Sequence, residues 1–249
     1  MIVGSASVES LAVNAAEIID YFTQAIEFSD VVCLQMTLEM HNQAREAVLP
    51  AGLHPTIPAT LSIQAWAVNQ SPWGAFTLVI CRVGCRSGVR ARGFTTAVYA
   101  SAAEVVSELR SQFGFPARLA DITFRHSYDG ADIKVSVGGK EILNIAALDP
   151  EPMGLNDVQY TGALNLAHTP NGLRLVQLEA NHQASRVERL KARLQTFNAA
   201  AFGNPLLDPY LVISASISQE SVTFSPIRFV CRPDELAFTG TEAISARTV

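Results

Sequence analysis

Two short glycine-containing turns constrain the fold of this chain more than any other feature of its sequence. They are Asp129-Gly130 and Gly138-Gly139. Glycine supplies the positive φ angles that two-residue hairpin loops need, and alternation of apolar and polar residues is typical of a half-buried strand. The alternating runs on either side of the turns are 117–127, 132–137 and 140–148. The sequence therefore predicts three consecutive antiparallel strands.

Strand-like runs fill most of the remaining chain, and helical patterns are few. Strands are predicted at 31–40, 59–68, 74–85, 89–99, 158–168, 172–180, 210–217 and 221–231. Helices are predicted from the spacing of apolar residues at 9–28, 41–52, 101–112 and 185–198. Strands and helices do not alternate regularly. We therefore predict one α+β domain over residues 1–249, built mostly of antiparallel strands, with residues 1–29 as a helical extension.

Composition excludes several classes of protein. Hydrophobic residues make up 49%, charged residues 16%, and the mean hydropathy is +0.21, so the chain is not disordered. No apolar run reaches the ~18–20 residues that span a membrane, and the first residues lack the basic start of a secretory signal. We therefore expect a soluble, cytoplasmic protein without a membrane partner. A net charge of -5 argues against binding to nucleic acid. The high apolar fraction indicates a large core or buried interfaces.

The sequence contains no motif for a metal or a cofactor. Its four cysteines form no C-x-x-C pair, and dinucleotide-binding, phosphate-binding, zinc-protease and nucleophile-elbow motifs are missing. We expect no cofactor, no metal site, and cysteines that act as small buried residues.

Four arginines occur within eleven residues, namely Arg82, Arg86, Arg90 and Arg92. They either cover a solvated or interface surface or capture an anionic group of a substrate.

Residues 101–121 combine a helical run with a Gly-aromatic-Pro turn that opens a strand. The informative residues are Arg110, Phe113-Gly114-Phe115-Pro116 and Leu119-Ala120-Asp121. This block resembles the segment around the reactive lysine of the acetoacetate decarboxylase family. The similarity extends over roughly residues 30–232, through Leu49-Pro50-Ala51-Gly52-Leu53, Gly74-Ala75-Phe76-Thr77, Tyr99, Arg193-Leu194-Gln195 and Asn204-Pro205-Leu206. The resemblance implies an α+β fold with a cone-like internal β-barrel and assembly into multimers.

The resemblance fails at the residues that the family's chemistry requires. Family decarboxylases form a Schiff base through the first lysine after the Pro, whose pKa is lowered. In this sequence that position is Ala117, followed by Arg118, and the family's acidic residue corresponds to Leu78. No arginine occurs near residue 31, where the family places one. The three lysines are expected around a hairpin turn (Lys134, Lys140) and on a charged helix (Lys191), so no lysine Schiff base is expected.

The sequence thus predicts an apolar cavity around Ala117 and Leu78 that binds a small hydrophobic substrate. The favoured function is a non-covalent enzyme for a cyclase, lyase or isomerase step on a hydrophobic, carbonyl-containing or polyketide-like intermediate of natural-product biosynthesis. Two alternatives remain open. One is a non-catalytic small-molecule-binding relative of the family, and the other is a β-keto acid decarboxylase that uses no lysine.

The candidate site residues form two groups. The polar side chains that could move a proton or hold an oxyanion are Arg118, Gln64, Tyr99 and His126. The expected walls of the cavity are Trp66, Trp73, Phe76 and Phe115, together with Ala117 and Leu78. Each has a structural alternative. Arg118 can point away from the cavity because neighbouring residues of a strand face opposite sides, and Tyr99 can belong to the core.

Overall fold

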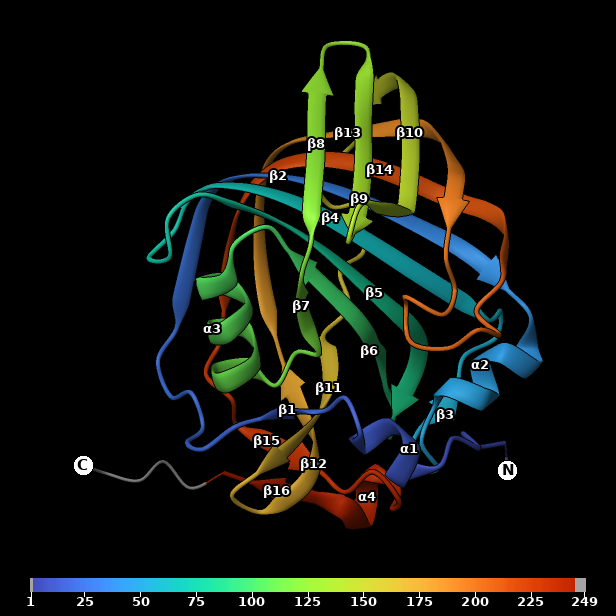
Figure 1. Ribbon diagram of the computed structural model, residues 1–249, viewed down its shortest axis with the longest axis vertical. Helices are drawn as coiled ribbons and strands as arrows, with labels where there is room; N and C mark the ends of the chain where they lie inside the picture. Colours follow the sequence, from blue (N-terminus) through green and yellow to red (C-terminus); the bar gives the residue numbers. More distant parts are fainter. Residues whose placement is uncertain (1, 245–249) are drawn as a thin grey trace.

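The computed structural model describes residues 2–244 and contains one large mixed sheet and four short helices in that range (Figure 1). The strand order is β16-β15-β12-β11-β6-β5-β4-β2-β14-β13-β10-β9-β8, and β1, β3 and β7 pair with β11, β5 and β6. The helices are α1 (Val8–Ala12), α2 (Asn42–Val48), α3 (Ala103–Phe113) and α4 (Ala237–Gly240). The strands are β1 (Ala16–Glu17), β2 (Ile26–Met40), β3 (His54–Pro55), β4 (Thr60–Gln70), β5 (Phe76–Ser87), β6 (Arg90–Ala100), β7 (Ala117–Leu119), β8 (Asp121–Ser127), β9 (Gly130–Val137), β10 (Lys140–Pro152), β11 (Ala163–Thr169), β12 (Gly172–Leu178), β13 (Ala180–Phe197), β14 (Pro209–Phe224), β15 (Phe229–Cys231) and β16 (Thr241–Ala243).

The predicted antiparallel unit is present as β8, β9 and β10. Its second turn is Gly138-Gly139, with φ angles of 57° and 77° that glycine adopts without strain. The first turn lies one residue earlier than predicted, and Gly130 opens β9. A Cβ atom at Gly130 would lie 2.1 Å from the carbonyl oxygen of Ala147, so only glycine fits at this close approach.

The helix predicted at 185–198 is wrong. These residues belong to β13, which pairs with β10 along one edge and with β14 along the other. Val187, Leu190 and Leu194 have helical spacing, but strand pairing on both edges overrides this local preference. The runs predicted at 210–217 and 221–231 form the single long strand β14 followed by the short β15.

The N-terminal helix predicted at 9–28 is also wrong. Only α1 is helical, and the Ser7 hydroxyl caps it by accepting a hydrogen bond from the Ser10 backbone N–H. Ile18 is buried in a small separate cluster, and Phe22 packs against Phe113 with ring centroids 4.8 Å apart. Ala16 and Glu17 pair with β11 as the short strand β1, so the backbone is extended in the middle of the predicted helix.

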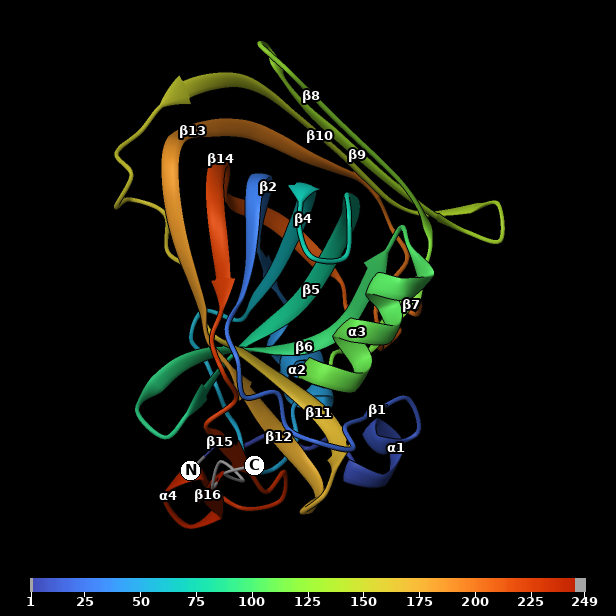
Figure 2. The same cartoon turned by 90° about the vertical axis from the view of Figure 1, so that its left-hand side faces the viewer.

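Alternation along β2, β4 and β5 gives the sheet two different faces. One face packs Leu34, Ile63 and Val79 into the main core together with β8–β10. The other face carries Trp66 and Leu78, and we call it the site face. Figure 2 shows β13, β14, β2, β4 and β5 in one strongly curved surface, with α3 beside β6 and β7. Within residues 2–244 no strand pairing joins the two ends of the sheet, so a closed cone-like barrel is not detected.

No helix in the range 2–244 is long and apolar enough to cross a membrane.

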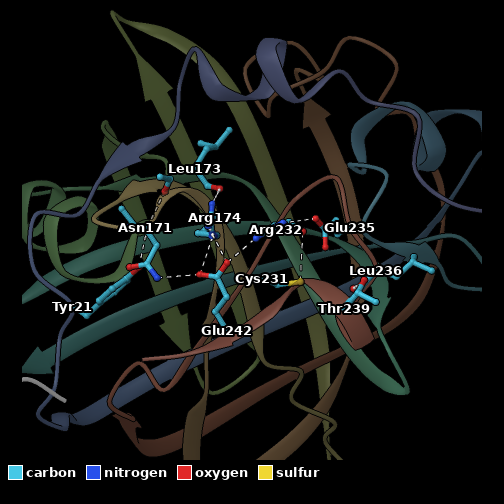
Figure 3. A network of polar contacts seen from close by, with 12 residues as sticks. Tyr21, Asn171, Leu173, Arg174, Cys231, Arg232, Glu235, Leu236, Thr239 and Glu242 are labelled. Carbon is cyan, nitrogen blue, oxygen red and sulfur yellow. Dashed lines mark hydrogen bonds and ion pairs between the residues drawn. The ribbon is translucent and has the colours of Figure 1, made fainter. Parts of the chain in front are cut away.

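An ion network holds together the edge formed by β12, β15 and β16 (Figure 3). Glu242 accepts hydrogen bonds from Arg174 Nη2 at 2.9 Å, from Asn171 Nδ2 at 3.0 Å and from Arg232 Nε at 3.4 Å. Arg232 also forms an ion pair with Glu235. The hydrogen bonds from Arg174 and Asn171 lower the pKa of Glu242 from its usual 4.5 to about 2.

We expect this network to weaken in acid. A carboxyl group whose pKa is lowered by folding stabilises the fold fully above its unfolded pKa of about 4.5, and that contribution is lost as the pH falls towards about 2. Thermal unfolding followed by circular dichroism should show the unfolding temperature falling more steeply below about pH 4.5 in the wild type than in Glu242→Gln. The exposed Glu17→Gln serves as the control and should follow the wild type. Identical acid profiles for all three proteins would contradict the prediction.

Candidate functional site

The site face changes from polar to apolar along β4 and β5. Along β5 from Arg82 to Leu78, the residues on this face are Arg82, Ile80 and Leu78, and their partners on β4 are Ser62, Gln64 and Trp66. Successive residues of the same face are about 7 Å apart along a strand. Ala117 joins the same face two strands away, through Val98 and Ile80. The arrangement therefore has a polar end at Arg82 and an apolar end at Leu78 and Ala117.

The apolar end brings together the predicted cavity walls. Leu78 and Ala117 are each 2% exposed, and they belong to one cluster with Trp66, Phe76 and Phe115, against which Trp73 packs. The ring of Phe28 lies edge-on to those of Trp66 and Phe76, at centroid distances of 6.5 and 6.0 Å. The expectation that this cluster opens around a ligand stays a prediction.

Three of the four predicted polar residues lie away from this cluster. Tyr99 and Arg118 are neighbours on β6 and β7 and face the opposite side from Ala117. The Tyr99 hydroxyl donates a hydrogen bond of 2.6 Å to the Ala201 carbonyl oxygen, and burial raises its pKa. Arg118 is exposed beside a small cavity of about 80 Å³. His126 is exposed on β8. Only Gln64 lies on the site face.

The polar end lines a cavity of about 470 Å³ whose most notable side chain is Arg82. This guanidinium is only 6% exposed, and its Nη1 donates to Gln64 Oε1 at 3.0 Å. Gln64 Nε2 in turn donates to Gln35 Oε1 at 2.6 Å, and Gln35 Nε2 donates to the Gln159 carbonyl oxygen at 3.0 Å. Burial lowers the pKa of Arg82 to about 10, so it remains charged at neutral pH. The two glutamines are neutral and leave this charge uncompensated.

The remaining charges of the cavity do not neutralise Arg82. In the described part of the chain no carboxylate lies within ion-pair distance of its guanidinium, and its Nε has no hydrogen-bond partner. Arg92 pairs with Glu179, and Arg189 pairs with Glu151. The arginine group of the sequence thus divides into buried Arg82 and Arg92 and exposed Arg86 and Arg90. Asp157 also lines this cavity, but its side chain is exposed, accepts a hydrogen bond from the Gly154 N–H and forms no ion pair with Arg82. A buried guanidinium without an ion-pair partner is a candidate binding site for a carboxylate or a similar anion.

A second polar cluster lies beside the apolar end. The side chain of Glu220 on β14 is fully buried and contacts three partners. Its Oε2 accepts hydrogen bonds from the Tyr160 hydroxyl at 2.6 Å and from the Ser218 hydroxyl at 3.1 Å, and its Oε1 lies 2.9 Å from His182 Nδ1. Burial, reinforced by the Glu220 charge, raises the pKa of the nearby Cys33 thiol well above its usual value, so this thiol is neutral.

The four cysteines are buried and free, as the sequence predicts. Among residues 2–244 no group of three His, Cys, Asp or Glu side chains is arranged to hold a metal ion.

Sequence reasoning named Arg82 only as one of a group of four arginines, and it did not identify Glu220, His182 or Tyr160 as site residues. One signal was present for Glu220. It shares one face of a strand-like run with Ser218 and the apolar Val222, so the run carries a carboxylate on a face that also holds an apolar residue. Such an inward-facing charge in a strand needs partners. Tyr160 lies in the irregular segment between β10 and β11, where no periodicity predicts which way a side chain points.

The chain matches no protein-family model and no curated protein. It is similar in structure to acetoacetate decarboxylase from Legionella pneumophila subsp. pneumophila str. Philadelphia 1, with a TM-score of 0.70 and 16% identity over 82% of this chain and 86% of that one. It is also similar to the enduracididine biosynthesis enzyme MppR complexed with pyruvate, with a TM-score of 0.66 and 17% identity over 83% and 90% of the two chains. An acetoacetate decarboxylase-like enzyme from Sphingomonas wittichii RW1 gives a TM-score of 0.68 at 12% identity over 82% and 91%. These similarities confirm the predicted mostly antiparallel fold of the acetoacetate decarboxylase type, whereas its closed barrel is not detected among residues 2–244.

Proposed function

We propose that this chain is an enzyme that binds a small, largely apolar carbonyl compound through an anionic end and converts it without a covalent intermediate. The reaction is a lyase, cyclase or isomerase step on a carbonyl-containing or polyketide-like intermediate. The observation that carries the proposal is the buried Arg82, which has no ion-pair partner among the described residues and lies on the wall of a cavity of about 470 Å³. Gln64 and the buried apolar cluster of Trp66 and Leu78 follow it along β4 and β5, and a ligand anchored on Arg82 would extend towards them where this cluster opens.

A carboxylate suits Arg82 better than a neutral ligand does. A buried guanidinium without a counter-ion carries a desolvation penalty that a bound carboxylate offsets with charge-assisted hydrogen bonds. The Nη2 atom donates to no described residue and is not among the polar atoms sealed from solvent, so at least one donor is free for the ligand. In the MppR complex named above the ligand is pyruvate, which is itself a carboxylate with a carbonyl group. A carboxylate-bearing carbonyl compound therefore fits both the charge and the fold.

The positions of the lysines support a mechanism without an imine. Lys134, Lys140 and Lys191 are all exposed on strands, and Lys191 lies on β13 rather than on the predicted helix. Asp149 accepts a hydrogen bond from Lys191 and raises its pKa, which is opposite to what a nucleophilic amine needs. Neither Ala117 nor Leu78 can replace the amine or the acid.

Borohydride trapping should therefore yield no adduct. Incubation with acetoacetate or pyruvate and sodium borohydride, followed by intact-mass measurement, is expected to leave the mass of the protein unchanged, because an exposed amine is protonated at neutral pH. A true imine-forming decarboxylase run in parallel provides the positive control. A stable adduct on Lys134, Lys140 or Lys191 would contradict the proposal of non-covalent chemistry.

Incubation with a panel of hydrophobic keto acids, followed by mass spectrometry, distinguishes the proposed function from its two alternatives. An enzyme of the proposed kind changes the mass, ring count or stereochemistry of the ligand. A non-catalytic binding protein returns it unchanged, and a lysine-independent decarboxylase releases carbon dioxide.

Ala117→Phe is the informative variant, because a large ring at the apolar end should reduce conversion while overpacking costs about 1–3 kcal/mol of stability. Full conversion by a folded Phe variant would remove the apolar end from the site.

A homo-oligomer, a closed cone-like barrel and a cytoplasmic location are further parts of this proposal. Light scattering during size-exclusion chromatography tests the first of these, and a mass equal to one chain would exclude it.

A further inference from the structure

The ring of His182 is held on three sides. Its Nδ1 lies 2.9 Å from Glu220 Oε1, its face stacks on Tyr160 at 3.7 Å with an interplanar angle of 6°, and the Trp66 ring meets it edge-on at 5.9 Å and 88°. The side chain is 5% exposed. A histidine so fixed has one orientation rather than a choice of rotamers.

The partners of Glu220 determine which ring nitrogen of His182 carries the hydrogen. Glu220 Oε2 already accepts from Tyr160 and Ser218, so Oε1 is the acceptor left for the imidazole. An ionised carboxylate can only accept, and neutral His182 must therefore donate from Nδ1 and keep the lone pair on Nε2. Burial and the hydrogen bond to Glu220 raise the pKa of Tyr160, which keeps its hydroxyl a donor.

The Nε2 atom of His182 is available to a ligand. It has no hydrogen-bond partner in the part of the chain that the structure describes, and it is not among the polar atoms sealed from solvent. Trp66, whose ring edge meets His182, pairs directly with Leu78 on the neighbouring strand. The indole N–H of Trp66 is itself sealed and has no partner within residues 2–244. The accessible base therefore lies at the edge of the apolar end, against the sealed Trp66 ring.

The base and the anion site lie on the same face, with Gln64 and Trp66 between them. Arg82 reaches Gln64, and Trp66 is two residues further along β4, about 7 Å away. A ligand carboxylate held by Arg82 and a carbon atom held near His182 are therefore several bonds apart. A γ- or δ-keto acid spans that distance better than a shorter acid does.

We propose that His182 is the general base of the site and that it removes a proton from the carbon next to the ketone of such a keto acid. The Nε2 lone pair takes the proton, the C–H electron pair forms the carbon–carbon double bond of the enolate, and the carbonyl electron pair moves to oxygen. Return of a proton from the imidazolium restores the ketone. Glu220 and Tyr160 are positioning residues, and the inference rests on the proposed function because Arg82 anchors the acid.

Exchange of hydrogen for deuterium in levulinate tests this step. The protein is incubated with levulinate in heavy water, and proton NMR follows the loss of the signals next to the ketone. We expect the wild type to accelerate exchange above buffer and His182→Gln to lower the catalysed rate about a hundredfold. Saturation-transfer NMR should show that levulinate still binds to His182→Gln, since Arg82 is unchanged. The exposed His168→Gln is the matched control and should exchange like the wild type.

The positioning residues need a measurement that a purely structural role would not alter. Glu220→Gln and Tyr160→Phe should reduce the exchange rate at saturating levulinate while leaving the half-saturating concentration nearly unchanged. The nitrogen NMR signals of the His182 ring should show one tautomer in the wild type and a mixture in Glu220→Gln. Unfolding temperatures identify any variant that fails to fold, and Tyr160→Phe, which keeps the stacked ring, then provides the test.

The outcomes separate this inference from the proposed function. Binding of levulinate without exchange by the wild type would overturn the role of His182 and leave the Arg82 site in place. Equal exchange rates in wild type and folded His182→Gln would also overturn it. If neither levulinate nor its δ-keto homologue binds, the proposed substrate class is wrong and both proposals fall.

Discussion

Replacing Arg82 by glutamine is expected to weaken the binding of carboxylate ligands roughly 10- to 100-fold, because hydrogen bonds to a charged group contribute about 1.5–3 kcal/mol. Binding of the methyl ester of the same ligand should change much less. The ligand-free variant should be as stable as the wild type or more stable, since the substitution removes a buried charge that has no counter-ion among residues 2–244. Ligand titration calorimetry and thermal unfolding measure the two effects.

Arg90→Gln is the matched control for this experiment. Arg90 belongs to the same arginine group but is exposed at the start of β6, so its loss should change neither binding nor stability beyond about 0.5 kcal/mol. A loss of stability in Arg82→Gln without a loss of binding would mean that Arg82 serves only to hold Gln64. Replacing a residue that serves binding should weaken ligand binding and leave the free energy of unfolding equal or higher. The reason is that ligand binding requires the buried charge, whereas folding alone does not.

The sequence could predict the antiparallel architecture because its strongest signals are local. The Gly138-Gly139 turn requires two positive φ angles, and the runs on either side alternate with period two, so β9 and β10 follow from short-range rules. The error at β13 has the opposite origin. Its apolar residues fit a helix equally well, and only the two neighbouring strands, which lie far away in sequence, decide in favour of extended backbone.

The candidate site was predictable only where strand alternation applies. Trp66, Leu78 and Ala117 meet because each occupies an inward position on a strand. Of these three, the resemblance to a known family pointed to Leu78 and Ala117 only. The same alternation explains why Arg118 could not join them, since it follows Ala117 directly and faces the other side. The cluster of Glu220 draws on β13, β14 and the segment before β11, and no local pattern connects these three parts.

Phe224→Ala should cause the largest loss of stability among substitutions at the apolar end. Phe224 is 1% exposed and its ring meets four others, which are Phe28 at 5.0 Å, Phe113 at 5.2 Å, Trp66 at 5.9 Å and Phe115 at 6.1 Å between centroids. Truncating such a buried ring removes its contacts and leaves a cavity, at a cost of about 3–5 kcal/mol. The unfolding temperature should fall on the order of 10 °C, as differential scanning calorimetry would show.

Phe238→Ala, on α4, is the control, because that ring is 80% exposed and its loss should lower the unfolding temperature by no more than a degree or two.

The size of the Phe224 effect also bears on the predicted cavity around Leu78 and Ala117. A large loss means that the five rings form permanent core, so the substrate stays between Arg82 and His182. A small loss means that the rings move apart easily, as they would where an apolar ligand enters. Partial recovery of stability on adding a small aromatic compound to Phe224→Ala would show that the space created is dry and closed, as expected for core.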